Sequence, residues 1–472
     1  MTAQLILGAL MPLPFWLWLR LHLGARSLGL PALLDVAPIA AAWLLIFAAL
    51  GRPLLAGLIC AVLVLALGIV NAAKRRTLDE PLVFTDTTML TAALRHPGLY
   101  LPFLRWPVVA GVAMVASTAL IMLLAVERPQ DPGLIGTLAL VGLALAILGF
   151  VVAPPAALIA RLPLVRDPVE DTARLGPLAT FALHRAVAAA ERPARRAALP
   201  PRPARRSARG PAPHLVLLQM ESFCDPRRLD PGAPADMLPH WDRLGATALA
   251  RGRLSVPGFG ANTNRTEFVV LTGITDEEMG LDRLNPYYRF ARQPVTSLAW
   301  ALRGAEYQSV CIHPFDPRFF GRHKVMPALG FHRFVTQEAF RDAPRIGRYV
   351  ADSAVAAKVV EELYAADGPR LLHAITMQAH GPWPGRDPAA TWQEHMRDAD
   401  AMIGTILESL ALLERPLLIA AFGDHRPSLA LARGGRDTDY LIWRSDLPGD
   451  SGEYDLDALK LHRAIRAAAG LG

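Results

Sequence analysis

The chain has 472 residues, of which 52% are hydrophobic, and it carries a formal net charge of +7 at pH 7. A chain of this length can hold more than one structural unit, and its apolar residues gather in the first third. Three cysteines, Cys60, Cys224 and Cys311, form neither a disulfide framework nor a zinc-finger spacing. The composition therefore argues against a disulfide-stabilised domain and predicts a membrane region followed by a globular α/β domain.

Five apolar stretches are long enough to cross a bilayer, which takes about 20 helical residues. They cover residues 4–23, 33–51, 53–73, 107–126 and 134–153. The first contains Pro12 and Pro14, which membrane helices tolerate, and we expect it to be retained rather than cleaved as a signal peptide. A tight hairpin at Gly51, Arg52 and Pro53 joins the second and third. No charged pair within these spans marks a translocation path, which disfavours a transporter.

The charges that flank the spans predict one orientation, and the chemistry of the C-terminal domain favours the other. The cations between the third and fourth spans are Lys74, Arg75, Arg76, Arg95 and Arg105. Only Arg52 and Arg128 lie on the opposite side. By the positive-inside rule alone, the C-terminal domain would be cytoplasmic. An amphipathic surface element over residues 74–106, with its cations on anionic membrane lipid, is the alternative that agrees with the chemistry described below.

Residues 192–213, RPARRAALPPRPARRSARGPAP, are rich in Pro, Arg and Ala. Such a run predicts a flexible, solvated linker with polyproline II character. Alternatively, its cations could lie on anionic lipid, each adding about 1 kcal/mol. Nucleic-acid binding is disfavoured because no aromatic residues alternate with the cations. We therefore predict a transmembrane domain over 1–155, a juxtamembrane helix and Arg/Pro-rich linker over 156–213, and a catalytic domain over 214–472.

After residue 213, short apolar runs alternate with helical patterns. The runs HLVLLQ, SVCIH, LLHAITM, LLIAAFG and DYLIW, which begin at residues 214, 309, 371, 417 and 439, predict buried strands. A helical pattern covers residues 395–413. The alternation predicts a parallel α/β sheet covered on both faces. Ligands of such a sheet gather at the carboxyl ends of its strands.

Residues that bind metals or anions stand at these strand ends. They are Glu221 in QMESF, His313 with Arg322 nine residues on, His380 in TMQAHGPW, and Asp424 and His425 in FGDH. Singly, Glu221 could be a helix cap and His380 a loop residue. Together, carboxylates and imidazoles suit Mn²⁺, Mg²⁺ or Zn²⁺. Thr263 lies on a predicted glycine-bracketed loop before a β-rich apolar run, and a hydroxyl bound to such a metal becomes a nucleophile.

The chain resembles the lipoteichoic acid synthase and phosphoglycerol transferase family of the alkaline phosphatase/sulfatase superfamily. The resemblance rests on QMESF, ANTNRTEF, FFGR, TMQAHGPW and FGDH, and on residues 71–86, where Asn71, Lys74, Pro81 and Asp86 match. It implies a five-helix N-terminal transmembrane domain and a C-terminal α/β sulfatase-like (alkaline phosphatase-like) domain. It also implies a multi-pass protein of the bacterial inner (cytoplasmic) membrane, with its catalytic domain facing the periplasm.

The resemblance implies roles for the residues at the strand ends. Glu221, Thr263, Asp424 and His425 would hold one divalent metal, with Mn²⁺ favoured over Mg²⁺ and Zn²⁺. Thr263 would attack the phosphorus of phosphatidylglycerol, diacylglycerol would leave, and a periplasmic or cell-surface glycan would accept the phosphoglycerol group from the threonine. His380 is the candidate acid/base. The expected substrate-binding residues are Arg322, His313, His380, Phe320, Asp316 and Ser428.

The sequence leaves other functions open. The same centre could transfer phosphoethanolamine, or hydrolyse a phosphodiester or a sulfate ester. Sulfate-ester hydrolysis is disfavoured because Thr263 is not in the Cys-or-Ser-x-Pro-x-Arg context in which sulfatases form formylglycine. A non-catalytic envelope scaffold is disfavoured because every expected metal ligand is present.

Overall fold

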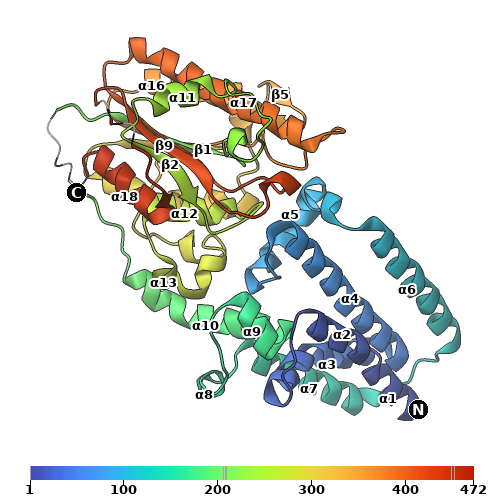
Figure 1. Cartoon of the computed structure of the whole chain (residues 1–472). Helices are drawn as coiled ribbons and strands as arrows, with labels where there is room; N and C mark the ends of the chain where they lie inside the picture. Colours follow the sequence, from blue (N-terminus) through green and yellow to red (C-terminus); the bar gives the residue numbers. More distant parts are fainter. Residues whose placement is uncertain (1, 206, 208–209, 448, 451, 472) are drawn as a thin grey trace. The chain divides into compact units, whose positions relative to one another are not determined.

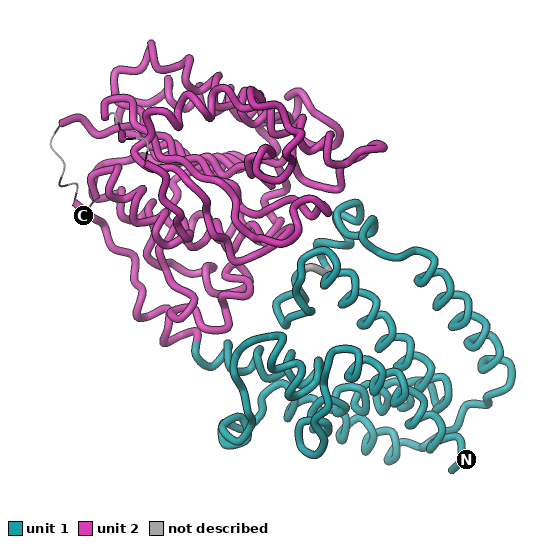
Figure 2. The backbone as a smooth tube through the Cα atoms, viewed as in Figure 1, with its two compact units in different colours: residues 1–191 teal, residues 192–472 magenta. Residues whose placement is uncertain are grey.

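The computed structural model describes residues 2–205, 207, 210–447, 449–450 and 452–471. The chain divides into two compact units, Met1–Glu191 (unit 1) and Arg192–Gly472 (unit 2), coloured separately in Figure 2. The boundary lies within helix α10 (Pro177–Ala197), so unit 2 begins earlier than the predicted catalytic domain.

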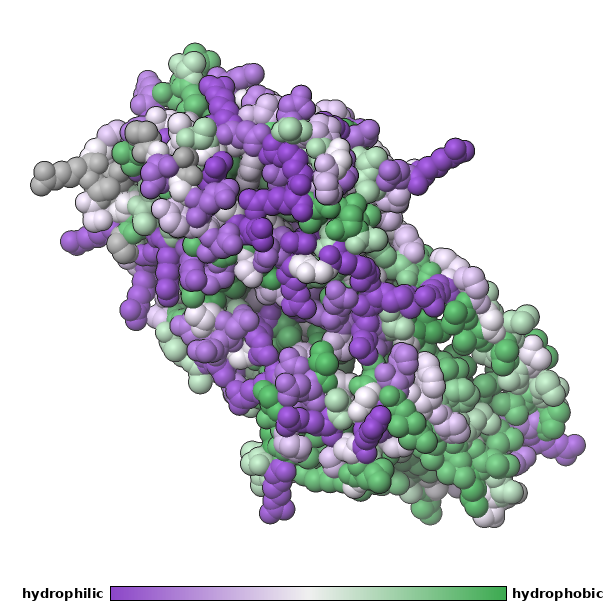
Figure 3. Space-filling view, in the orientation of Figure 1, coloured by the Kyte–Doolittle hydropathy of each residue, from purple (hydrophilic) through white to green (hydrophobic). Residues whose placement is uncertain are grey.

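Unit 1 contains the five predicted spans. They are α1 (Thr2–Leu10) with α2 (Leu13–His22), then α3 (Leu30–Leu50), α4 (Pro53–Leu78), α6 (Trp106–Val126) and α7 (Gly133–Val152). All five are long and apolar enough to cross a membrane. The first is interrupted between α1 and α2, next to Pro12. Apolar side chains accordingly gather on the surface of this unit (Figure 3).

A buried ion pair lies within unit 1, which corrects the prediction of spans without a charged pair. Arg20 on α2 donates to Asp35 on α3 over 2.9 Å, and both side chains are almost fully buried. Asp35 also accepts hydrogen bonds from the backbone N–H groups of Leu178 and Ala179, in the first turn of α10. A buried carboxylate is tolerated when it is paired and hydrogen-bonded in this way. The pair therefore anchors the start of a helix.

The segment after α4 is held together by its own polar contacts. Lys74 Nζ lies 2.7 Å from Asp86 Oδ2, and Asn71 accepts a hydrogen bond from the backbone of Leu82. Lys74 is thus paired within the protein, and the expectation that the cations of residues 74–106 hold lipid headgroups stays a prediction. The remaining helices of unit 1 are α5 (Thr87–Arg95), α8 (Ala156–Ile159) and α9 (Pro168–Leu175), with short 3₁₀ turns at Phe84–Asp86, Pro97–Leu99 and Leu101–Phe103.

Unit 2 is built on an eight-stranded sheet in the order β10-β2-β9-β8-β1-β7-β3-β4. Its strands are β1 (His214–Met220), β2 (Ala250–Ser255), β3 (Gln308–Ile312), β4 (Arg333–Val335), β7 (Arg370–Ile375), β8 (Leu417–Gly423), β9 (Thr438–Arg444) and β10 (Leu456–Asp457). Five of them, β1, β3, β7, β8 and β9, correspond to the predicted strands, although β3 and β7 end one or two residues before the predicted runs. The prediction of an all-parallel sheet is wrong, because β9 runs antiparallel to both β8 and β2. Parallel neighbours need a long crossover, usually a helix, and only a 3₁₀ turn lies between β8 and β9.

Helices cover both faces of this sheet (Figure 1). One layer is α11 (Pro239–Gly245), α16 (Asp352–Tyr364) and α17 (Pro388–Glu408), and the other includes α12 (Thr263–Thr272) and α18 (Ala458–Ala468). Side chains of β1 alternate between the two cores, with Leu215 and Leu217 in one and Val216 and Leu218 in the other, as the two-residue period of a strand dictates. The smaller elements are α13 (Asp276–Met279), α14 (Leu298–Arg303), α15 (Arg322–Ala328) and the hairpin β5 (Arg345–Ile346) and β6 (Tyr349–Val350).

The described part of the Arg/Pro-rich run is helical and partly packed at its start, whereas many of its later residues are exposed, as the predicted linker would be. Helix α10 continues to Ala197, and Arg192 is only 6% exposed. Beyond the helix, Leu199 accepts a hydrogen bond from the Thr296 backbone, and Leu199 and Ala204 pack against a core of the domain. Leu199 and Ala204 supply apolar surface for this packing. The predicted lipid contact of Arg206 and Arg209 lies outside the described residues.

Candidate active site

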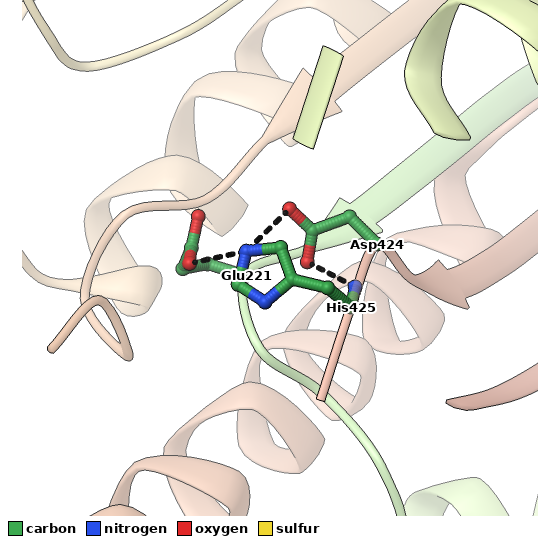
Figure 4. A group of neighbouring side chains, drawn as sticks. All are labelled: Glu221, Asp424 and His425. Atoms are coloured by element: carbon green, nitrogen blue, oxygen red, sulfur yellow. Dashed lines mark hydrogen bonds and ion pairs between the residues drawn. The ribbon is translucent and has the colours of Figure 1, made fainter. Parts of the chain in front are cut away.

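The register of β1 against β8 brings three metal-type residues together. Met220 pairs with Gly423, so Glu221 and Asp424 leave the sheet side by side, with His425 next to them. His425 Nε2 lies 3.3 Å from Glu221 Oε1 and 3.5 Å from Asp424 Oδ2. Figure 4 shows the three side chains converging. Gly423 is required here, because a Cβ at this position would overlap the Phe223 carbonyl.

Neighbouring groups fix the orientation of these side chains. The Ser222 hydroxyl donates to Glu221 Oε1 over 3.0 Å, and the Ser222 N–H donates to Asp424 Oδ1 over 3.0 Å. His425 Nδ1 lies 3.0 Å from the Arg426 carbonyl oxygen. A carbonyl oxygen only accepts, so Nδ1 carries the proton, and in the neutral ring Nε2 presents a lone pair to the cluster.

The cluster has the chemistry of a cation site. One ligand atom from each of Glu221, Asp424 and His425 lies within 4.8 Å of the others, and all three residues are buried. Among the described residues, Asp424 Oδ2 and His425 Nε2 have no hydrogen-bond partner. Buried polar atoms without a partner are costly and rare. Two oxygen donors and one imidazole nitrogen around one point therefore fit a divalent cation.

Without a cation, the three groups shift one another's pKa values. Burial, reinforced by the Glu221 charge, raises the pKa of Asp424 to about 7 although His425 opposes this. Burial would also raise the pKa of Glu221, but the charges of His380 and His425 lower it to about 2. The two carboxylates outweigh burial at His425 and raise its pKa to about 9. The site therefore favours a positive charge between its carboxylates.

Thr263 is the first residue of α12 and not a loop residue as predicted. The apolar run that follows it is also helical, so its β-like composition was misleading. Burial raises the pKa of Asp424, and the nearby Thr263 hydroxyl is one of the groups that oppose this rise. The Thr266 hydroxyl donates to the Asp424 carbonyl over 2.8 Å and ties α12 to the loop that follows β8. The structure thus brings Thr263 to the cluster from a distant part of the sequence.

Arg322 lies in a buried network next to the cluster. Its Nε donates to Glu267 Oε1 over 3.2 Å, and its Nη1 lies 3.3 Å from His313 Nε2. Glu267 also accepts hydrogen bonds from Tyr287 and Gln219. Sequence reasoning missed Glu267, although it stands four residues after Thr263, which a helical reading of the same run would have placed on the same face.

His313 is held as a neutral ring. Burial and the Arg322 charge lower the pKa of His313 to about 3. Its Nδ1 lies 3.3 Å from the Ile375 carbonyl oxygen, so Nδ1 is the donor and Nε2 accepts from Arg322. His313 therefore orients the arginine as an acceptor.

His380 is half-buried and lies near the cluster. Its Nδ1 is 2.6 Å from the Gly381 carbonyl oxygen and 3.3 Å from the Tyr349 hydroxyl. The carbonyl keeps the proton on Nδ1, which leaves Nε2 for proton exchange. The nearness of His380 to Glu221 is evident from its effect on the Glu221 pKa. Tyr349, on β6, is a second contact that sequence reasoning missed.

The remaining predicted substrate residues differ in their surroundings. The Phe320 ring centre lies 5.3 Å from the guanidinium carbon of Arg322. Asp316 is paired locally with Arg318, whose Nε lies 3.1 Å from Asp316 Oδ1, so this carboxylate is engaged by the protein itself. Ser428 is half-exposed, three residues after His425. The cysteines Cys60, Cys224 and Cys311 are buried and free, as expected.

A family model described as "Sulfatase" matches residues 213–457. The chain belongs to the sulfatase family. A related sequence, "Capsular polysaccharide biosynthesis protein RkpI" of Rhizobium meliloti (strain 1021), is 31% identical over 400 residues and covers 79% of this chain and 74% of its own length. The resemblance to the alkaline phosphatase/sulfatase superfamily is thereby confirmed.

Two solved structures are similar to this sulfatase-family chain. The integral membrane protein lipooligosaccharide phosphoethanolamine transferase A (EptA) from Neisseria meningitidis superposes with a TM-score of 0.54 at 12% identity, over 100% of this chain and 96% of that one. Phosphoglycerol transferase GacH of Streptococcus pyogenes gives a TM-score of 0.49 at 20% identity, over 56% and 76% of the two chains. The likeness to EptA confirms the predicted fold, a helical membrane region followed by a sulfatase-like domain.

Family membership identifies the chain as an enzyme of the superfamily of phosphotransferases and sulfatases. Members of this superfamily use a divalent metal, and the cluster of Glu221, Asp424 and His425 supplies a matching set of ligands. The five apolar helices make it a membrane-anchored enzyme.

Proposed function

We propose that this enzyme transfers a phosphoglycerol group from phosphatidylglycerol to an envelope glycan through a covalent intermediate on Thr263. The single observation that carries the proposal is the convergence of Glu221, Asp424 and His425 at one point, with helix α12, which begins at Thr263, tied to Asp424 by the Thr266 hydroxyl. Thr263 would complete the ligand set, and the divalent cation, Mn²⁺ in our proposal, would make its hydroxyl more acidic and stabilise phosphoryl charge.

The protein residues divide the remaining work. Thr263 Oγ1, having lost its proton to solvent, attacks the phosphorus and forms a new P–O bond. The bond from phosphorus to the diacylglycerol oxygen breaks, and that oxygen takes a proton from His380 Nε2. The neutral ring then accepts a proton from the incoming glycan hydroxyl, which attacks the phosphorus and releases Thr263. His380 suits both steps, because its Nδ1 is held by the Gly381 carbonyl.

Phosphate oxygens would be bound by Arg322, with His313 holding the guanidinium in place. Arg322 is 1% exposed, so water screens its charge little, although its ion pair with Glu267 offsets part of that charge. Phe320, Ser428 and the locally paired Asp316 remain candidates for contacts with the glycerol. Phosphoethanolamine transfer is the second candidate, since the EptA fold covers the whole chain.

An intermediate on Thr263 is directly testable. The purified full-length protein is incubated with Mn²⁺ and vesicles of phosphatidylglycerol, and its peptides are analysed by mass spectrometry. We expect a glycerophosphoryl adduct on Thr263 and release of diacylglycerol. A phosphoethanolamine adduct from phosphatidylethanolamine vesicles would support the second candidate. Free glycerol phosphate in place of an adduct would indicate a hydrolase, and full function of Thr263→Ala would indicate a scaffold.

The acceptor and the location belong to the same proposal. A glycan acceptor agrees with the name of the RkpI relative, which assigns that protein to capsular polysaccharide biosynthesis. We place the enzyme in the bacterial inner membrane with unit 2 in the periplasm, against the count of flanking cations. A periplasm-dependent reporter fused after Gly472 tests this orientation, and activity only in the cytoplasm would refute it.

A further inference from the structure

Two arginines at the end of α10 grip one segment of the catalytic domain. Arg192 donates to both oxygens of Asp282, with Nε 2.9 Å from Oδ2 and a terminal nitrogen 2.8 Å from Oδ1. Arg192 is 6% exposed and Asp282 is 1% exposed. Paired guanidinium and carboxylate groups in this two-point geometry are strongly directional. We call Arg192 and Arg195 the arginine clamp.

Arg195 holds the same segment through its backbone. It donates to the carbonyl oxygens of Glu277 and Glu278 over 2.6 and 3.1 Å. Gly280 lies directly against it, because a Cβ at Gly280 would come within 2.8 Å of the Arg195 guanidinium carbon. Gly280 also has a φ of 59°, a conformation that glycine adopts without strain. The clamp therefore fits a backbone that only glycine allows.

The gripped segment, residues 276–292, contacts α12 directly. We call it the bridge segment. Asn264 donates to Asn285 Oδ1 over 2.7 Å, and Arg265 Nε donates to the Leu284 carbonyl over 2.9 Å. Asn264 and Arg265 are the two residues that follow Thr263, and all these contacts are buried.

A third contact connects the bridge segment to the phosphate-binding network. The Tyr287 hydroxyl donates to Glu267 Oε1 over 2.8 Å, and Glu267 holds Arg322. The bridge segment therefore contacts the helix of Thr263 at its first turn and again at the counter-ion of Arg322. Moving it would shift both.

We propose that the arginine clamp is a positioning element of the active site, which acts through the bridge segment on Thr263 and Arg322. This rests on the proposed function, because it concerns the placement of the same nucleophile. Buried, directional hydrogen bonds transmit a displacement along this series of contacts. Small errors in the position of reacting groups lower the rate of group transfer. The start of the Arg/Pro-rich run, which composition predicts to be a linker, thus helps to position Thr263 and Arg322.

The test compares Arg192→Gln and the milder Arg192→Lys with the full-length wild type. We expect the rate of adduct formation on Thr263 to fall by about 10-fold or more in Arg192→Gln, with cation affinity unchanged. Arg192→Lys keeps the charge but loses the two-point geometry, so an intermediate loss is expected. Glu191→Gln is the matched control, since Glu191 precedes Arg192 in the chain and pairs with Arg166 at a more exposed position. Its adduct rate should equal that of the wild type.

Hydrogen exchange separates the inference from the proposed reaction. Amides of residues 264–272 should exchange faster in Arg192→Gln than in Glu191→Gln, whatever the substrate. The double variant Arg192→Gln/Asn264→Ala should lower the logarithm of the adduct rate by less than the sum of the two single effects. Both substitutions interrupt the same series of contacts, so their effects should not add. A lower melting temperature with wild-type adduct rate and wild-type exchange at 264–272 would overturn the inference. If the wild type forms no adduct but exchange still responds, the proposed function fails and the clamp stands.

Discussion

The carboxylate of Glu267 and the guanidinium of Arg322 form a buried ion pair, with Arg322 Nε 3.2 Å from Glu267 Oε1. Although burial opposes charge on both groups, their mutual attraction lowers the pKa of Glu267 and raises that of Arg322. Glu267 follows Thr263 by one helical turn on α12. One helix therefore carries both the proposed nucleophile and the residue that fixes the proposed phosphate-binding arginine.

Replacing Glu267 by glutamine should impair both stability and turnover. Removing one partner of a buried pair leaves the other charge uncompensated and costs about 3–5 kcal/mol. We expect a lower melting temperature and a slower appearance of the Thr263 adduct in Glu267→Gln. The exposed Glu338 is the control, since Glu338→Gln should change neither. Wild-type adduct formation in Glu267→Gln would show that Arg322 does not need this partner.

Divalent cations should stabilise the purified protein. A ligand that binds only the folded state adds about 2.7 kcal/mol to the free energy of unfolding at 100 times its dissociation constant. A bound cation would also reduce the repulsion between the Glu221 and Asp424 carboxylates. We expect Mn²⁺, Mg²⁺ or Zn²⁺ to raise the melting temperature, and a chelator to reverse the rise. The order of the three ions identifies the preferred one. An equal rise in Glu221→Ala would place the binding site elsewhere.

His380→Gln should retain cation binding and slow both halves of the transfer. General acid–base catalysis contributes about 10²- to 10⁴-fold, so the adduct should form and decay more slowly by a factor in this range. The Tyr349 hydroxyl, 3.3 Å from His380 Nδ1, is a secondary contact, and Tyr349→Phe should have a much smaller effect. The measurement is the rate of adduct formation followed by the rate of its loss to an added acceptor. Unchanged rates in His380→Gln would remove His380 from the mechanism.

Asp352 should make the folded state less stable as the pH rises. It is fully buried, and neither of its carboxylate oxygens has a hydrogen-bond partner in the described part of the chain. Burial, together with the Asp398 charge, raises its pKa from the ordinary value of 3.8 to about 8. Between these values the folded state keeps a proton that the unfolded chain releases, so the free energy of unfolding falls with pH.

Asp352→Asn removes this titration. We therefore expect the melting temperature to fall less between pH 5 and pH 8 in Asp352→Asn than in the wild type. Asp342→Asn, at an exposed position, controls for the change of charge. Equal pH profiles in the wild type and Asp352→Asn would show that Asp352 is ionised throughout.

The strand ends were predictable because they depend on local pattern. Buried strands read as continuous apolar runs, and the residues just after β1 and β8, Glu221 and Asp424, follow such runs directly. The parallel register then brings them together. The direction of β9 was not predictable from its apolar run, because such a run looks the same in either orientation. The direction follows instead from the link after β8, which is too short to hold a crossover helix.

The features that sequence reasoning missed are long-range pairs between residues whose local pattern carries no signal. Arg20 and Asp35 lie on different helices, as do Glu267 and Arg322 at their buried pair. The valine-rich run after Thr263 favours a strand by composition, and tertiary packing overrides that preference in α12. Composition likewise gave no sign that the start of the run at 192–205 is helical and anchored, since the partner of Arg192 lies 90 residues away.

The ligands of the cluster are far apart in the sequence, since Glu221 follows the first strand of the domain and His425 follows β8. A nascent chain that stops short of His425 already contains Thr263 but has nothing to activate it. Such a fragment, although inserted among the lipids that we propose as donors, would leave them intact. Under the proposed function, synthesis order alone thus delays lipid cleavage until the complete set of cation ligands is present.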